Sequence, residues 1–174
     1  WLDFCNITEG ISDEEIISTF ESRINGGNTE KSISKSLNNL FEKKLSSTEW
    51  ISKQFIFKDR NFKKTAWSLD YHKERTGLEI SFHHEAAITW KLMKSVLANQ
   101  PNEIRKNFDI GLGIFVFATD EMRDVGGFDP GIITFEKAEN YATALSNFLT
   151  FPIIFIGLKA PLTFHIKHFK DELK

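Results

Sequence analysis

Two carboxylates are the residues of this sequence whose type and spacing could do chemistry. Asp70 and Glu79 stand nine positions apart, with a turn-like segment over residues 73–77 between them. Glu79 is flanked by Leu78 and Ile80 in an apolar stretch. An ionised carboxylate in such a place costs free energy unless it is solvated, paired or bound to a metal.

A hairpin through this segment would bring the two carboxylates side by side. Neighbouring carboxylates repel each other, and a proton or a divalent cation relieves the repulsion. Oxygen ligands favour Mg²⁺, Mn²⁺ or Ca²⁺, and Mg²⁺ is typically held by one or two carboxylates together with substrate phosphates. Such a metal activates water and neutralises phosphate charge. The alternative is that both acids lie on the solvent-facing side of an amphipathic hairpin, and the spacing alone favours that simpler interpretation.

The elements that must position this pair follow from the periodicity of the apolar residues. Strands are predicted over residues 51–57, 65–72, 78–82, 109–119 and 152–158. Helices are predicted over residues 13–24, 30–45, 88–97 and 134–149, and a polar, glycine-rich loop over 121–130. The three early strands favour an antiparallel meander and the later alternation favours parallel strands, so the sequence predicts an α/β fold with a mixed β-sheet flanked by helices.

Length and composition indicate one domain with a core of its own. The 174 residues are 41% hydrophobic and 26% charged, which is ordinary for a globular protein. We expect a single domain over residues 1–174, with a helical N-terminal part over about 12–45 and an α/β core over about 50–160. Cys5 is the only cysteine, and neither a membrane-length apolar run nor a signal peptide is recognisable. These features predict a cytoplasmic protein.

Charge is distributed unevenly along the chain. The net charge is −2, yet eleven basic residues stand against five acidic ones between Lys31 and Arg75, a local balance of +6. Taken alone, such a stretch is more often a solvated face. A local basic patch is nonetheless sufficient to contact phosphates, because such binding acts through contacts and not through total charge.

The segment from Leu69 to Phe82 resembles the catalytic hairpin of the BglII/BstYI group of type II restriction endonucleases, members of the PD-(D/E)XK nuclease superfamily. The nine-residue interval between Asp and Glu and the Glu-x-polar-Phe ending both match. The likeness extends to the helical segment 36–45, to the strand start at 109–113 and to the strand at 152–158, and so covers most of the chain loosely.

This resemblance implies a Mg²⁺-dependent endonuclease, with Mn²⁺ as a substitute, that cleaves double-stranded DNA at specific sites as a homodimer. It implies that Asp70 and Glu79 are catalytic metal ligands and that the backbone carbonyl of Ile80 is a third ligand. Ser81 would be the third catalytic side chain, at a position held by Lys in the superfamily and by Gln or Glu in this branch. Leu69 stands where the motif has Pro.

Two alternatives remain beside the active nuclease. A serine hydroxyl can orient a water but is a poor base, so Ser81 motivates a catalytically weakened DNA-binding or regulatory domain of the same fold. The other alternative is an unrelated α/β interaction module in which Asp70 and Glu79 are surface charges.

Several further residues are candidates for contact with DNA. They are basic or histidine side chains near the hairpin or in the predicted 121–130 loop, namely Lys73, Arg75, His83, His84 and Arg123. Because adjacent residues on a strand point to opposite faces, His83 and His84 would not chelate one metal together. His165 and His168 lack the further ligands that a zinc site needs, and we interpret them as part of a solvated or phosphate-contacting tail.

Overall fold

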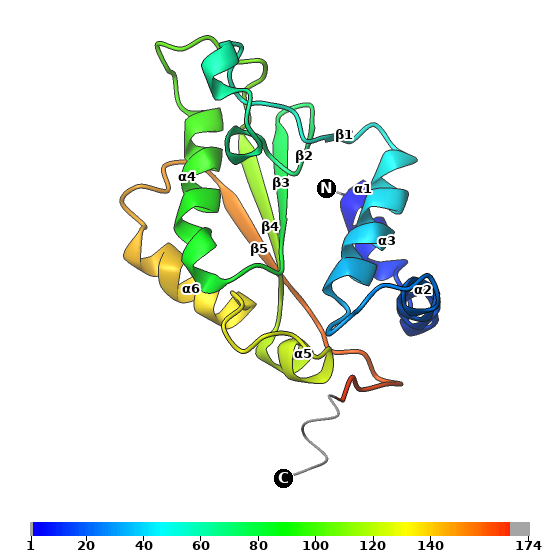
Figure 1. Ribbon diagram of the computed structural model, residues 1–174. Helices are drawn as coiled ribbons and strands as arrows, with labels where there is room; N and C mark the ends of the chain where they lie inside the picture. The colour runs from blue at the N-terminus through cyan, green and yellow to red at the C-terminus, as the bar shows by residue number, and fades with distance from the viewer. Residues whose placement is uncertain (1, 168–174) are drawn as a thin grey trace.

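A computed structural model describes residues 2–167 of the chain, and its centre is a five-stranded mixed sheet between two layers of helices (Figure 1). The strands occur in the sheet in their chain order, β1-β2-β3-β4-β5. This arrangement confirms the predicted α/β fold with a mixed sheet flanked by helices. His168 and the two ends of the predicted domain lie outside the described residues.

The strands become longer from the first edge toward the centre of the sheet. They are β1 (Ile51–Ser52), β2 (Tyr71–Lys73), β3 (Thr76–Ser81), β4 (Leu112–Ala118) and β5 (Ile153–Leu158). Strands β1, β2 and β3 pair antiparallel, whereas β4 runs parallel to both β3 and β5. The early meander and the parallel later half therefore follow the prediction.

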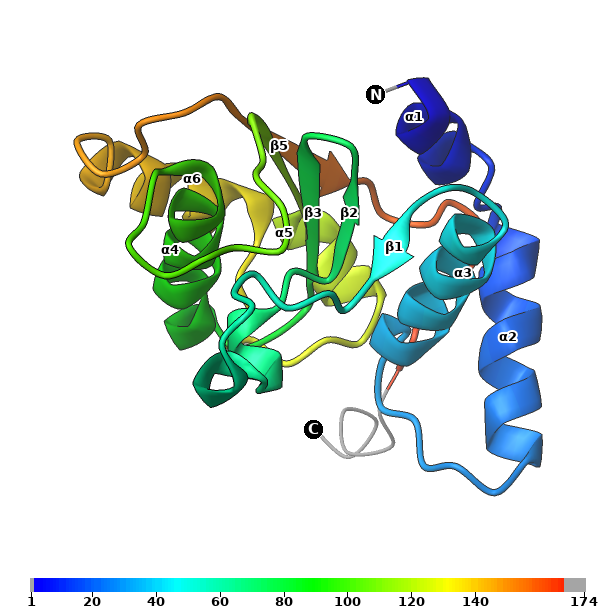
Figure 2. The ribbon, with the colours of Figure 1, turned by 90° about the horizontal axis from the view of Figure 1, so that it is seen from above.

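Helices cover both faces of the sheet, as the view from above shows (Figure 2). The first face carries α1 (Leu2–Glu9), α2 (Asp13–Asn25) and α3 (Ser34–Ser46), and the opposite face carries α4 (Ile88–Asn99) and α6 (Phe135–Ala144). A short helix, α5 (Asp120–Val125), follows β4. None of the helices within residues 2–167 combines the length and the apolar character needed to cross a membrane.

The alternation along β3 decides which side chains reach which helical layer. Leu78, Ile80 and Phe82 belong to the core that packs against α1, α2 and α3. Glu79 and Ser81 project from the other face, toward α4, because successive side chains of a strand point to opposite sides. Strand β3 therefore places a carboxylate on a face that a helix covers.

Tertiary contacts shift several predicted boundaries. Helix α2 begins as expected at the Ser12 capping box. Helix α3 begins four residues later than predicted, because Glu30 is paired with Arg23 at 2.8 Å and the Ile33 amide donates to the Gly126 carbonyl. These contacts hold residues 30–33 against their neighbours outside any helix.

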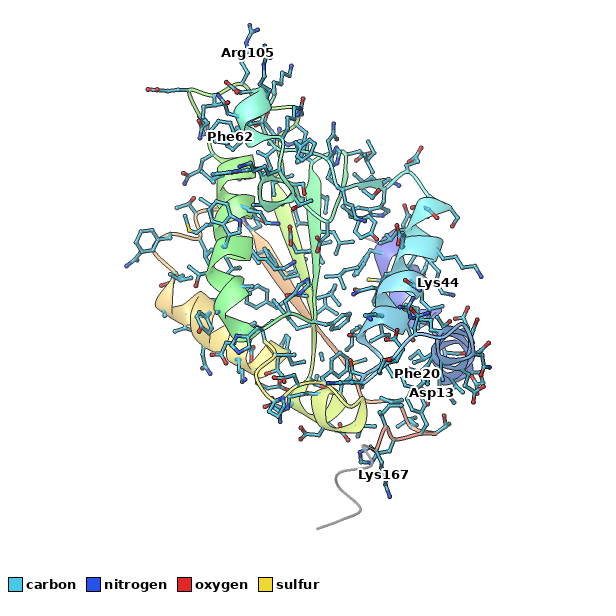
Figure 3. The ribbon with its side chains drawn as sticks, in the orientation of Figure 1. Asp13, Phe20, Lys44, Phe62, Arg105 and Lys167 are labelled. Carbon is cyan, nitrogen blue, oxygen red and sulfur yellow. The ribbon has the colours of Figure 1, made fainter. Side chains whose placement is uncertain are left out.

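The predicted strands over 51–57 and 65–72 are mostly wrong. The chain leaves the sheet after Ser52, with Lys53 at φ 52°, and residues 65–67 form a 3-10 helix. Phe57, Phe62 and Trp67 pack ring against ring, with centroids 4.9 to 5.9 Å apart. Phe62 and Arg105 lie at the same end of the molecule (Figure 3). Burial of these rings against one another, which strand periodicity does not describe, shapes the segment.

The predicted 121–130 loop begins with a helix instead. The Thr119 hydroxyl accepts a hydrogen bond from the Met122 amide and caps α5. Helix α1 was not predicted, and its Phe4 is fully buried against Phe41 and Trp50. Helix α5 depends on a local cap, and helix α1 depends on apolar partners distant in the sequence. Neither cause appears in the periodicity of apolar residues.

We expect Gly77→Ala to lower the free energy of unfolding by about 1–3 kcal/mol. Gly77 pairs with Gly113 across β3 and β4. A Cβ at position 77 would lie 2.8 Å from a methyl group of Leu69 and 3.0 Å from one of Ile110. Urea denaturation of both proteins measures the effect, and an unchanged midpoint would show that the two side chains give way at no cost.

Candidate active site

The β2–β3 hairpin brings Asp70 and Glu79 together. Tyr71 pairs with Leu78, so the next cross-strand neighbours toward the open end are Asp70 and Glu79. A two-residue turn at 74–75 closes the hairpin, with Glu74 at φ 50°. The pairing predicted from the nine-residue interval is present in the structure.

Two lysines from helix α4 complete a cluster of four charged side chains. The Lys91 Nζ lies 2.6 Å from Glu79 Oε2 and 3.1 Å from Asp70 Oδ2. The Lys94 Nζ lies 2.9 Å from Glu79 Oε1 and donates to the Ser68 carbonyl at 2.7 Å. Lys91 and Lys94 are three residues apart and share one helix face. Two carboxylates and two ammonium groups give the cluster a balanced formal charge.

The two carboxylates differ in how far they are exposed to solvent. The side chain of Glu79 is 1% exposed, and those of Lys91 and Lys94 are 9% and 7% exposed, whereas that of Asp70 is 37% exposed. The alternative in which both acids lie on a solvent-facing side is therefore wrong for Glu79. Its carboxylate is compensated by ion pairs and not by water.

Asp70 opens into a cleft of about 210 Å³ at the end of the hairpin. The Ile80 amide donates a hydrogen bond of 3.0 Å to Asp70 Oδ2, which fixes that oxygen at the inner wall. The cleft is lined by residues from α3, from the β1–β2 segment and from the hairpin, namely Asn38, Glu42, Lys53, Asp70, Tyr71, Ile80 and His83. Glu79 lies behind this surface, next to Lys91.

Burial and ion pairing act in opposite directions on the pKa of Glu79 and on the pKa of Lys91. Burial raises the pKa of Glu79, and Lys91, Asp70 and Lys94 act on it as well, the two lysines opposing the rise. Burial alone would lower the pKa of Lys91, but the carboxylates of Glu79 and Asp70 outweigh it and raise that pKa above its ordinary value. Lys91 is therefore a charged ammonium that two carboxylates hold in place.

Comparisons with known proteins agree with this architecture. The sequence model of the family "Restriction endonuclease BglII/BglIII" matches residues 5–158. The chain belongs to the BglII/BglIII restriction endonuclease family. The crystal structure of restriction endonuclease BglII complexed with a DNA 16-mer is similar in fold, with a TM-score of 0.58 and 18% sequence identity. The match covers 70% of this chain and 54% of that one, so the present chain spans about half of its length. Comparison with curated proteins finds no match.

Membership in the BglII/BglIII family excludes the alternative of an unrelated α/β interaction module. Ser81 stands at the position where the resemblance to restriction endonucleases predicts Lys, Gln or Glu. Its side chain is fully buried, and its Oγ has no hydrogen-bond partner among the described residues. The catalytic role of Ser81, like the ligand role of the Ile80 carbonyl, stays a prediction.

Acidic neighbours neutralise two of the predicted DNA contacts in this BglII-family chain. The Lys73 Nζ lies 2.7 Å from Asp3 and 3.1 Å from Glu49. Arg123 pairs with two aspartates of its own helix α5, each at 2.8 Å. Any contact of either side chain with phosphate would have to compete with these pairs.

The other three predicted DNA contacts lie at different places. His83 lines the cleft beside Asp70. The His84 Nδ1 accepts a 3.4 Å hydrogen bond from the Ala86 amide, and Arg75 is exposed in the hairpin turn. Of the five predicted residues, the structure therefore brings only His83 into the cleft.

Sequence reasoning missed Lys91 and Lys94. The available signal was a pair of lysines at helical i, i+3 spacing inside a helix predicted for its apolar residues, with Lys91 next to Leu92. Lysines in helices are usually solvated, so the signal gained meaning only once Glu79 was placed opposite. Lys53 was counted in the basic stretch but not predicted as a cleft residue.

Proposed function

We propose that this chain is a Mg²⁺-dependent endonuclease that hydrolyses phosphodiester bonds of double-stranded DNA at specific sites, with Mn²⁺ as a substitute metal. The observation that carries the proposal is that Asp70 and Glu79 contact one and the same cation, the Lys91 ammonium. Carboxylates that share one ammonium are close enough to share a metal ion. Membership in the BglII/BglIII family supports DNA as the substrate.

The donor set fits Mg²⁺ better than a metal that needs a complete protein cage. Within residues 2–167, no three His, Cys, Asp or Glu side chains form a metal-binding group. Asp70, Glu79 and the Ile80 carbonyl would be the protein ligands, all of them oxygens. Mg²⁺ commonly keeps several waters and binds through one or two carboxylates plus substrate phosphates. When bound, the metal supplies an activated water and neutralises charge on the phosphate.

The residues of the cleft orient the substrate. Asp70 presents its carboxylate to the opening while the Ile80 amide fixes one of its oxygens. Behind the cleft, an ion pair of 2.9 Å joins Lys94 to the second oxygen of Glu79. Lys53 and His83 line the cleft and can donate hydrogen bonds to phosphate oxygens. These contacts would bring a phosphodiester to Asp70, with Glu79 buried behind it.

We further propose that the chain forms one endonuclease domain and acts as a homodimer. Each copy would cut one strand, because a palindromic site mirrors the two-fold symmetry of the protein that reads it. Lys73, Arg75, His84 and Arg123 remain candidates for contacts outside the cleft.

Supercoiled plasmid incubated with the protein and Mg²⁺ or Mn²⁺ is expected to yield discrete fragments. EDTA is expected to reduce cleavage to background, because it removes the metal that would activate the water. A gel-shift titration in Ca²⁺ measures DNA binding in parallel, and binding should weaken with added salt. Binding without cutting would favour the catalytically weakened domain, and absence of both would contradict a role on DNA.

A further inference from the structure

We propose that Lys91 is the basic residue of this site and that, in the DNA-free protein, its ammonium holds the place that the divalent cation takes. The inference rests on the proposed nuclease function. It adds that helix α4, and not strand β3, supplies the cationic side chain of the site.

Strand β3, which carries Glu79 and Ser81, has no cationic side chain. Position 81 carries a serine, whose side chain is fully buried and whose Oγ has no partner among the described residues. A neutral hydroxyl cannot compensate the charge of Glu79, which projects from the same face of β3. The compensating charge must therefore come from another element.

Lys91 occupies the position from which both carboxylates can be reached. Its Nζ lies 2.6 Å from Glu79 and 3.1 Å from Asp70. Lys94 contacts Glu79 and the backbone but not Asp70. Lys91 thus differs from its neighbour in bridging the pair.

The packing of α4 fixes this placement. Ile88 and Leu92, on either side of Lys91 along the helix, are fully buried in one cluster with Phe115 and Phe117 of the central strand β4. The helix backbone is therefore anchored over the sheet, and the Lys91 side chain extends from an anchored turn toward Glu79.

Lys91 and a divalent ion compete for the same oxygens. Asp70 is open to the cleft, whereas Glu79 is buried and its Oε2 is in contact with the ammonium. Two cations cannot occupy that place together, because like charges at contact distance in a buried site repel strongly. Lys91 must move before Glu79 can bind a metal.

The side chain of Lys91 is suited to such a movement. Lysine carries a compact charge on a flexible four-carbon chain, so the ammonium can leave the carboxylates while the helix stays in place. A phosphate of bound DNA in the cleft would offer it a new anionic partner. In this way Lys91 positions Asp70 and Glu79 in the free protein and couples metal binding to DNA binding.

The test is a comparison of Lys91→Met with the unchanged protein in two assays. Calorimetric titration of the DNA-free protein with Mn²⁺ should show binding about tenfold tighter in the variant, because the competing ammonium is gone. Cleavage of plasmid at saturating Mn²⁺ should fall about 100-fold, because a preorganised charge near the phosphate is lost. The two effects have opposite signs, whereas a lysine needed only for folding would weaken both.

One matched control and one competing variant complete the test. Lys106 is likewise about 9% exposed and is ion-paired with Asp109 outside the site, so Lys106→Met should change neither Mn²⁺ affinity nor cleavage. Ser81→Ala tests the competing assignment, in which position 81 of strand β3 supplies the third catalytic side chain. Because the Ser81 hydroxyl has no hydrogen-bond partner among the described residues, we expect a smaller loss of cleavage than in Lys91→Met. If Ser81→Ala instead costs as much as Lys91→Met, the assignment of the basic residue to α4 is wrong.

Further outcomes separate this inference from the nuclease proposal. Unchanged or weaker Mn²⁺ binding in folded Lys91→Met overturns the inference about Lys91. Tighter Mn²⁺ binding with full cleavage overturns it as well. Lys91→Gln, which keeps a hydrogen-bond donor without the charge, replaces Lys91→Met if circular dichroism shows that the methionine variant is unfolded. If the unchanged protein cuts no DNA, the nuclease proposal fails. The inference that the Lys91 ammonium holds the place of the divalent cation is overturned separately, by an unaltered Mn²⁺ affinity in both Lys91 variants.

Discussion

Asp70→Asn is expected to lower the rate of DNA cleavage by about 100-fold or more while leaving the protein folded and able to bind DNA. Asparagine keeps the size of the side chain and an acceptor for the Ile80 amide. It loses the negative charge that a divalent ion requires. Because the Asp70 side chain is 37% exposed, water can solvate the new amide, so the change should cost little stability. Cleavage of supercoiled plasmid in Mg²⁺ and in Mn²⁺ measures the effect.

The matched control is Asp109→Asn. Asp109 is an exposed aspartate that is also ion-paired to a lysine, Lys106, but it lies outside the cleft. Its substitution should leave the cleavage rate unchanged. A gel shift in Ca²⁺ checks that Asp70→Asn still binds DNA. Cleavage by Asp70→Asn at the unaltered rate would refute the proposed metal site.

Glu79→Gln is expected to lower the free energy of unfolding by about 3–5 kcal/mol, in addition to abolishing cleavage. Glu79 is the common partner of Lys91 and Lys94, and all three side chains are nearly inaccessible to water. Without the carboxylate, the ion-pair partner left to Lys91 among residues 2–167 is Asp70, and Lys94 keeps the neutral Ser68 carbonyl. The loss is large because it leaves buried ammonium groups with too little negative charge.

Chemical denaturation measures this cost against that of a surface pair. The side chain of Glu49 is 84% exposed and is paired with Lys73. Glu49→Gln should therefore lower the free energy of unfolding by less than about 1 kcal/mol. A double-variant cycle with Lys94→Met adds a sharper test. The combined variant Glu79→Gln, Lys94→Met should be more stable than the sum of the two single losses predicts, by about 1 kcal/mol or more. Additive losses would mean that the two side chains are not energetically coupled.

The stability effect also bears on how activity is measured. A loss of cleavage in Glu79→Gln has two possible sources, a missing ligand and a less stable protein. Asp70→Asn separates them, since it removes one of the proposed ligands without leaving two buried lysines short of negative charge. Cleavage by both variants should therefore be compared at a temperature where each is folded.

The sequence by itself determined the pairing of Asp70 and Glu79. Both residues belong to one hairpin, and nine intervening steps with a central turn suffice to place them opposite each other. The alternation of β3 and the apolar run of β4 likewise follow from neighbouring residues, and the resemblance of the hairpin indicated the family that the comparison then showed. These features depend on contacts between residues near in the chain.

The tertiary structure alone decided what surrounds the pair. The burial of Glu79, the cleft beside Asp70 and the ion pairs with Lys91 and Lys94 arise because α4 packs over the face of the sheet from which Glu79 projects. A lysine in a helix is ordinarily solvated, and only the buried carboxylate opposite makes it part of a site. Charge compensation between elements distant in sequence is a property of packing, and periodicity along the chain does not record it.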